Sequence, residues 1–135
     1  MKWVRVHANE FGIDAKRIGF MGFSAGAVTA MNVATAYDGV SRPDFLGVVY
    51  GAMPERAVPR DAPPAFILVA ADDPLLAYAA TPIFDAWRTA GKSAELHVYA
   101  KGGHGFGTKK QGTSSDHWLE DYFNWLVAEG FAKGP

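Results

Sequence analysis

The feature that most constrains this chain is an apolar segment, residues 17–27, that breaks at a glycine, presents one serine and continues into a run of small residues. A strand that turns into a helix within two residues holds the intervening side chain in a strained backbone and points it outward. Gly22 and Gly26 flank Ser24, and we predict that side chains at either glycine would collide with the neighbouring strand and helix. The pattern therefore predicts a nucleophile elbow with Ser24 at its tip.

The residue after Ser24 has an expected role of its own. Ala25 would open the helix, where backbone N–H groups lack intrahelical acceptors and the helix dipole favours a negative charge. We therefore predict that the Ala25 N–H is one donor of an oxyanion hole. The pattern G-x-S-x-G also arises by chance and serine commonly caps helices, so the alternative is that Ser24 only caps this helix.

Composition narrows the class of protein. The chain has 135 residues, is 49% hydrophobic and contains no cysteine, which predicts a single compact domain over residues 1–135 without disulfides, thiolate metal sites or a cysteine nucleophile. The net charge of -1 argues against nucleic acid or an anionic membrane as the partner. Residues 1–7 lack the apolar core of a signal peptide, and no apolar run is long enough to span a bilayer, which favours a cytoplasmic protein.

Helical and strand patterns alternate along the chain. Apolar runs predict strands at 17–21, 45–50, 65–70 and 95–99, and amphipathic spacing predicts helices at 2–11, 25–37, 81–91 and after residues 114–116. Thr81 is expected to cap the third of these helices. In the last helix, one continuous buried stripe is expected at Trp118, Leu119, Tyr122, Phe123 and Leu126. This alternation predicts the α/β class, with a mainly parallel sheet of about four strands and helices on both faces.

Polar groups follow three of the predicted strands, where the chemistry of such sheets gathers. The first strand leads to Ser24, the third to Asp72 and Asp73, and the fourth to His104 in a glycine-rich loop. A hydroxyl, a carboxylate and an imidazole in the chain order Ser, Asp, His predict a catalytic triad. We choose Asp73 as the aspartate because Pro74 after it holds its backbone extended, and we expect Asp72 to order the loop.

The histidines have structural alternatives. His104 could simply fill a turn between its glycine neighbours. His7, His97 and His117 fall on a helix, on a strand and in a helix cap, and we expect structural roles for them because their scatter does not suit a zinc site. The proposed chemistry needs no cofactor, and we find no motif for one.

These passages resemble the C-terminal half of α/β-hydrolase carboxylesterases, in the acetylxylan-esterase-like and dienelactone-hydrolase-like branch. The matching segments are 12–19 leading into 22–26, then 70–74, then 95–99 leading into 102–106. The resemblance implies hydrolysis of a carboxylic ester through an acyl-serine intermediate. It assigns Ser24 as nucleophile, Asp73 as orienting acid, His104 as general base and acid, and the Ala25 N–H as an oxyanion donor. The family also carries an earlier HGGG-like loop with further oxyanion donors, and no such loop precedes Ser24 here.

The resemblance leaves the activity and the partners open. With only the loop 53–64 as a lid, we expect a small-molecule ester with a short acyl group such as acetyl. One alternative is a truncated fragment that catalyses weakly or only assembles or binds ligand, and another is a thioester, lactone or peptide hydrolase on the same scaffold. In the family a strand from the earlier half flanks the elbow strand, so segment 17–21 is expected to be an apolar edge through which the chain forms a homodimer.

Overall fold

The computed structural model describes residues 1–53 and 56–134. Residues 54 and 55 of the predicted lid therefore lie outside the described residues. The elements in chain order are α1 (Lys2–Val6), β1 (Phe20–Phe23), α2 (Ala25–Thr35), β2 (Leu46–Val49), β3 (Ala65–Ala70), α3 (Ala80–Thr89), β4 (Ala94–Tyr99), the 3-10 turn η1 (Ser114–His117) and α4 (Trp118–Ala128).

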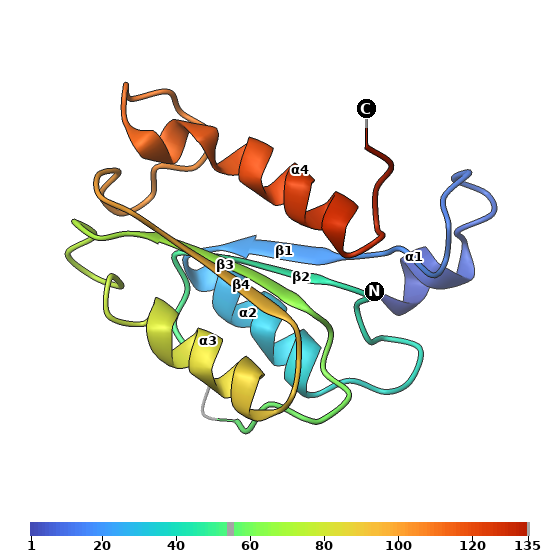
Figure 1. The fold of residues 1–135 in the computed structure, drawn as a ribbon. Helices are drawn as coiled ribbons and strands as arrows, with labels where there is room; N and C mark the ends of the chain where they lie inside the picture. The colour runs from blue at the N-terminus through green and yellow to red at the C-terminus, as the bar shows by residue number, and fades with distance from the viewer. Residues whose placement is uncertain (54–55, 135) are drawn as a thin grey trace.

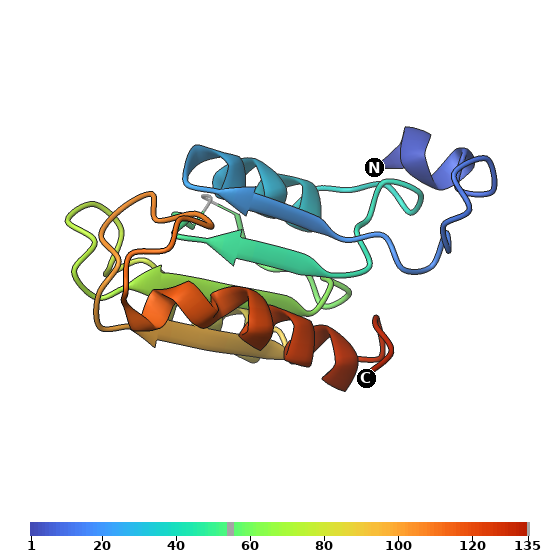
Figure 2. The same cartoon turned by 90° about the horizontal axis from the view of Figure 1, so that it is seen from above.

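The strands form one parallel sheet in the order β1-β2-β3-β4, which confirms the predicted α/β class (Figure 2). The register places Leu46 beside Phe20 on one side and beside Ala65 on the other. Because the strands are parallel, their carboxyl ends meet at one edge of the sheet. The turn from β1 into α2 and the loops that follow β3 and β4 lie together at this end of the sheet (Figure 1).

Helices cover both faces of the sheet, as predicted. α2 and α3 lie on one face and α4 lies on the other (Figure 1). α2 packs against β1 and β2 through the small buried side chains of Ala27, Ala30 and Ala34, which allow helix and sheet to approach closely. All of β3 is buried, as expected of an apolar strand covered on both sides. Nowhere in residues 1–53 and 56–134 does a helix combine the length and apolar character needed to cross a bilayer.

Two N-terminal boundaries differ from prediction. β1 starts at Phe20, which is the first residue paired with β2, opposite Leu46, and its N–H donates to the Phe45 carbonyl at 3.0 Å. Before that point Ile18 bonds to one residue only: the Asp44 carboxylate accepts the Ile18 N–H at 2.8 Å, and the Asp44 N–H donates to the Ile18 carbonyl at 2.9 Å. α1 ends at Val6 and not near Phe11, because the following residues form successive turns that close on Gly12 in the left-handed region, φ 64°.

The later helices correct two further predictions. α3 starts at Ala80, and no side chain caps it, so Thr81 lies within the helix. The stripe predicted on α4 is buried only in part, because Leu119 and Phe123 are 49% and 43% exposed. α4 instead meets the sheet through aromatic rings, with Tyr122 and Trp125 packed against Phe66 of β3 at 5.2 and 5.6 Å between centroids.

β1 lies at one edge of the sheet. Within the described residues it pairs with β2 alone. α4 runs mainly over the opposite half of the sheet (Figure 2). Trp118 of α4 packs edge-on against Phe23 of β1 at 5.9 Å between centroids, and Phe23 is still 38% exposed. An apolar strand edge of this kind is suited to pairing with further chain.

Candidate active site

The turn from β1 into α2 holds Ser24 in a strained conformation. Ser24 has φ 52° and ψ -119°, a region that non-glycine residues occupy only under the constraint of the surrounding structure. Its N–H donates to the Val49 carbonyl at 2.9 Å, and its own carbonyl accepts the Ala27 N–H at 2.9 Å. The backbone is therefore anchored to β2 on one side and to the first turn of α2 on the other. Ala25 is the first residue of α2, so its N–H belongs to the helix N-terminus, where donors lack intrahelical acceptors.

The two glycines of the elbow play different roles. A side chain at Gly22 would place its Cβ 2.0 Å from the Gly26 carbonyl oxygen, so β1 and α2 can approach this closely only with glycine at Gly22. A Cβ at Gly26 would meet nothing within 4 Å. The predicted collision at Gly26 is therefore wrong, since the tight contact uses the backbone of Gly26 and not the space where its side chain would be.

Ser24, His104 and Asp73 form one hydrogen-bonded relay. The Ser24 Oγ lies 2.9 Å from His104 Nε2, and His104 Nδ1 lies 2.8 Å from Asp73 Oδ2. An ionised carboxylate only accepts hydrogen bonds, so Nδ1 carries the proton and Nε2 is free to accept the serine hydroxyl. The Ser24 side chain makes no capping bond to α2. The structure thus brings together the three residues that the sequence pattern singled out.

Asp73 is fixed on both carboxylate oxygens. Its side chain is fully buried, and Oδ1 accepts the N–H groups of Leu75 and Leu76 at 2.8 and 3.0 Å. Burial alone would raise the pKa of Asp73, but the hydrogen bonds from His104, Leu75 and Leu76 outweigh it and lower the pKa below its ordinary value. The carboxylate therefore stays ionised and holds one tautomer of the imidazole.

Asp72 contacts the backbone of the loop that carries His104. Its Oδ1 accepts the Gly103 N–H at 2.8 Å, and its Oδ2 lies 3.7 Å from the Lys101 ammonium. The hydrogen bond from Gly103 is the main cause of a lowered pKa of Asp72. The two adjacent aspartates thus divide their contacts, with Asp73 on the imidazole and Asp72 on the loop.

Two aromatic residues at the site were not singled out as functional from the sequence. The Gly107 N–H donates to the Tyr50 hydroxyl at 3.2 Å, and the Trp118 Nε1–H donates to the Gly107 carbonyl at 2.7 Å. Tyr50 follows β2, which is the one strand whose carboxyl end was assigned no polar group. The position of Tyr50 at the end of a predicted strand was the sequence signal that could have identified it. The helical spacing of Trp118 indicated only a position in the core.

The other three histidines each lie within hydrogen-bond distance of a residue close to them in the sequence. His7 Nδ1 lies 2.8 Å from the Trp3 carbonyl oxygen, His97 Nε2 lies 2.7 Å from Glu95, and His117 Nδ1 lies 3.4 Å from Glu120. In the part of the chain that the structure describes, no three histidine, aspartate or glutamate side chains are grouped to hold a metal ion.

Comparison of nearly the whole sequence with known protein families identifies the family of this chain. Residues 3–129 match the sequence profile described as the Dienelactone hydrolase family. This chain belongs to the dienelactone hydrolase family. The match covers the relay, the elbow and both aspartates, and it confirms the resemblance found from the separate motifs.

Solved structures of hydrolases share this fold. An acetyl ester-xyloside bifunctional hydrolase from Caldicellulosiruptor lactoaceticus superposes with a TM-score of 0.88 at 24% identity, covering 96% of this chain and 63% of that one. Esterase 2 of Thermogutta terrifontis gives 0.83 at 22% identity, covering 99% and 62%. This chain thus spans less than two thirds of the length of these relatives. No curated protein sequence matches it.

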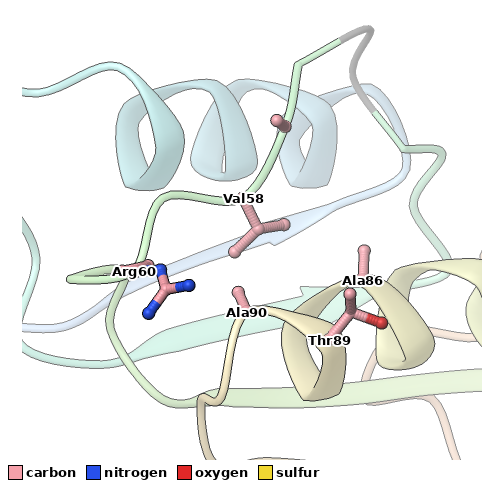
Figure 3. Close-up of a pocket in the computed structure, with 6 residues that line it drawn as sticks. Val58, Arg60, Ala86, Thr89 and Ala90 are labelled. Atoms are coloured by element: carbon pink, nitrogen blue, oxygen red, sulfur yellow. The ribbon is translucent and has the colours of Figure 1, made fainter.

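One hollow in this family member lies apart from the relay. It has a volume of about 410 Å³ and lies between α3 and the loop that precedes β3 (Figure 3). Its walls are formed by Ala57, Val58, Arg60, Ala86, Thr89 and Ala90. None of the three relay residues contributes to it, so any chemistry at Ser24 takes place elsewhere, at the carboxyl end of the sheet.

Proposed function

We propose that this chain is a serine esterase that hydrolyses carboxylic esters with short acyl groups, acetyl esters among them. The observation that carries the proposal is the relay from Ser24 through His104 to Asp73, built on a strained elbow. A serine hydroxyl is a weak nucleophile and needs a base in hydrogen-bond contact, which His104 provides at 2.9 Å. Membership of the dienelactone hydrolase family supports the same class of reaction.

Acylation follows from the positions of the protons. The Ser24 Oγ attacks the ester carbonyl carbon while its proton passes to His104 Nε2. Asp73 stabilises the imidazolium that forms, and the Ala25 N–H donates to the oxyanion of the tetrahedral intermediate. The intermediate collapses with cleavage of the bond to the alcohol oxygen, which takes the proton from Nε2. The products are the free alcohol and an acyl ester of Ser24.

Deacylation repeats the steps with water as the nucleophile. His104 accepts a proton from water as the water oxygen attacks the acyl carbonyl carbon, and it returns the proton to the Ser24 Oγ as the carboxylic acid leaves. No step requires a metal ion or an organic cofactor.

The short-acyl preference draws support from two relatives. The enzyme from Caldicellulosiruptor lactoaceticus is named as acting on an acetyl ester, and the Thermogutta terrifontis esterase has been captured with propionate bound. Both acyl groups are small. A clear preference of this chain for long acyl chains over acetyl would contradict this part of the proposal.

The test is to trap the acyl-enzyme. Mixing the chain with p-nitrophenyl acetate is expected to give a rapid release of about one p-nitrophenolate per chain, since acylation of activated esters outruns deacylation. Acid quenching and peptide mass spectrometry should then locate the acetyl group on Ser24. An unmodified Ser24, with no burst, would contradict the proposal. A thioester and an aminoacyl amide run beside the ester separate an esterase from a thioesterase or a peptidase.

The second candidate is a part of a hydrolase that assembles or binds ligand with little catalysis of its own. It draws support from the coverage of the relatives, of which this chain spans about 63% in the first example. A hydrolase that lacks one oxyanion donor typically reacts roughly a hundred- to a thousandfold more slowly, which would account for weak catalysis by such a part. Normal binding of an ester analogue without acylation of Ser24 would favour this candidate.

We also propose that the chain forms a homodimer through the edge of β1. The support is the position of β1 beside β2 alone within the described residues, together with the partial exposure of Phe23 on this strand. Exposed strand edges pair readily, and a two-fold arrangement would join two sheets into one. We expect sedimentation velocity at low micromolar concentration to show a dimer. A stable monomer across that range would overturn this proposal.

A further inference from the structure

The loop that carries His104 has few side chains with which to hold itself in place. Gly103, Gly105 and Gly107 all have left-handed backbones, with φ of 67°, 79° and 52°, and glycine adopts this region at little steric cost. The same freedom makes the loop expensive to order, because glycine loses more conformational entropy on folding than any other residue. Besides the buried ring of Phe106, contacts to the backbone of this loop therefore help to hold the imidazole at Ser24.

Both backbone polar groups of Gly107 form hydrogen bonds with aromatic side chains. Its N–H donates to the Tyr50 hydroxyl at 3.2 Å, and its carbonyl accepts the Trp118 Nε1–H at 2.7 Å. Tyr50 follows the end of β2 and Trp118 starts α4, so the two contacts tie the loop both to the sheet and to the helix on one of its faces. Both side chains are almost fully buried, at 4% and 2% exposed.

The backbone of Tyr50 indicates that its side chain is kept there at a cost. Tyr50 has φ 38°, in the left-handed region where a bulky residue is an outlier and glycine is favoured. Such strain persists where the surrounding structure over-determines the position, and it gathers at functional sites. The Tyr50 ring lies edge-on against the His104 imidazole at 5.1 Å between centroids, so the strained residue contacts both the loop backbone and the base.

The nucleophile is tied to the same cluster. Phe23, the residue directly before Ser24, lies edge-on against Tyr50 at 6.1 Å and against Trp118 at 5.9 Å between ring centroids.

The Tyr50 hydroxyl is neutral. Burial raises the pKa of Tyr50, the hydrogen bond from the Gly107 N–H lowers it, and the nearby charge of Asp73 raises it further. The phenol therefore stays neutral and accepts the Gly107 N–H without adding a negative charge beside the relay.

We propose that Tyr50 and Trp118 are positioning residues that grip Gly107 from two sides and so hold His104 against Ser24. The Tyr50 hydroxyl and the Trp118 Nε1–H bond to Gly107 and not to Ser24 or a ring nitrogen of His104, so their effect reaches the reaction through the loop. The consequence for catalysis rests on the proposed esterase function, whereas the consequence for the geometry of His104 does not.

The test removes one hydrogen-bonding group at a time. Tyr50→Phe deletes only the hydroxyl, and Trp118→Phe deletes the Nε1–H while keeping an aromatic ring. Each has a matched control elsewhere: Tyr99→Phe loses a hydroxyl that donates to Asp121, and Trp87→Phe loses an Nε1–H that donates to the Pro63 carbonyl at 2.9 Å. The controls report the cost of losing such a bond away from Gly107.

We expect each of the two test variants to lower kcat about tenfold, with KM changed less than about twofold, because the misplaced base affects the transition state more than binding. The double variant should lose less than the product of the single effects, since both bonds hold one residue. The controls should lower the unfolding midpoint while leaving kcat unchanged. Equal kcat in the test variants and wild type, or equal losses in the controls, would overturn the proposal.

A second readout does not depend on esterase activity. In protein labelled with ¹⁵N-histidine, the His104 Nδ1–H that donates to Asp73 is expected to exchange with solvent slowly while the loop is held. We expect this exchange to become about tenfold faster in Tyr50→Phe and Trp118→Phe, as the loss of one hydrogen bond favours opening, and to be unchanged in the controls. Unchanged exchange in the test variants would overturn the proposal. If wild type forms no acyl-enzyme, the esterase function fails and this exchange alone decides the role of the two residues.

Discussion

Ser24→Ala is expected to abolish the burst of p-nitrophenolate and to lower the steady-state rate of ester hydrolysis by about 10⁴- to 10⁶-fold. The change removes the atom that forms the acyl bond. The imidazole and the carboxylate remain in place, but His104 then has no hydroxyl to activate. What is left is the slow reaction that binding and the Ala25 N–H support with water as the nucleophile.

The structure offers a matched control for this variant. Ser93 has a side chain that also makes one hydrogen bond, to Glu129, and it precedes β4 at the opposite end of the sheet. Ser93→Ala should leave the burst unchanged. Both variants should unfold cooperatively, as followed by circular dichroism in urea, because an alanine fits where either serine stands. Equal burst amplitudes in Ser24→Ala and wild type would contradict the role of Ser24 as nucleophile.

Asp73→Asn is expected to lower kcat by about 10⁴-fold by imposing the wrong tautomer on His104. The Leu75 and Leu76 N–H groups donate to one oxygen of this side chain, so the amide oxygen of the new residue would occupy that position. The amide NH₂ would then face His104 Nδ1, which must accept a hydrogen bond. The ring proton moves to Nε2, and the base can no longer accept the Ser24 hydroxyl proton.

The same variant has a defined effect on the pH dependence of stability. Hydrogen bonds hold the pKa of Asp73 below its ordinary value in the folded chain. Its contribution to the free energy of unfolding is therefore complete above the unfolded pKa of about 4 and is lost as the pH falls through the lowered folded pKa. Urea denaturation at several pH values should show a shallower loss of stability below pH 4 in Asp73→Asn than in wild type.

A variant of Asp72, the neighbouring carboxylate, tests whether the charge or the hydrogen bond of this side chain matters. Asp72→Asn keeps an oxygen that can accept the Gly103 N–H and loses only the weak attraction to Lys101, so we expect kcat to fall by less than about tenfold. A loss in Asp72→Asn as large as that in Asp73→Asn would show that both aspartates act on the loop and that neither is specific to the imidazole.

Much of the fold could be predicted because its signals are local. The strand Ala65–Ala70 was predicted with its exact bounds, since an uninterrupted apolar run has no other place than the centre of a covered sheet. Ser24, Asp73 and His104 follow the ends of β1, β3 and β4 within five residues, and parallel strands bring their carboxyl ends to one edge. The order of three short motifs was therefore enough to predict that the three side chains meet.

Other features depended on partners that no local pattern reveals. The start of β1 was misplaced because Asp44, far along the chain, takes the N–H of Ile18. Gly26 was given a steric role that belongs to Gly22 alone, since only the packed structure shows where each Cβ would point. Leu119 and Phe123 were expected in the core because helical spacing reports which residues share a face and not how far the sheet extends beneath it.

The sequence by itself determined the parallel α/β class, the elbow and the residues of the relay, because these follow from periodicity, from the chemistry of a few residue types and from chain order. The tertiary structure alone decided how the relay is held. Tyr50 and Trp118 lie 68 positions apart in the printed sequence, and they meet at Gly107 only because β2 and α4 pack on either side of one loop. Contacts between distant segments depend on the geometry of the whole sheet, and for that reason the support of the site was visible only in the fold.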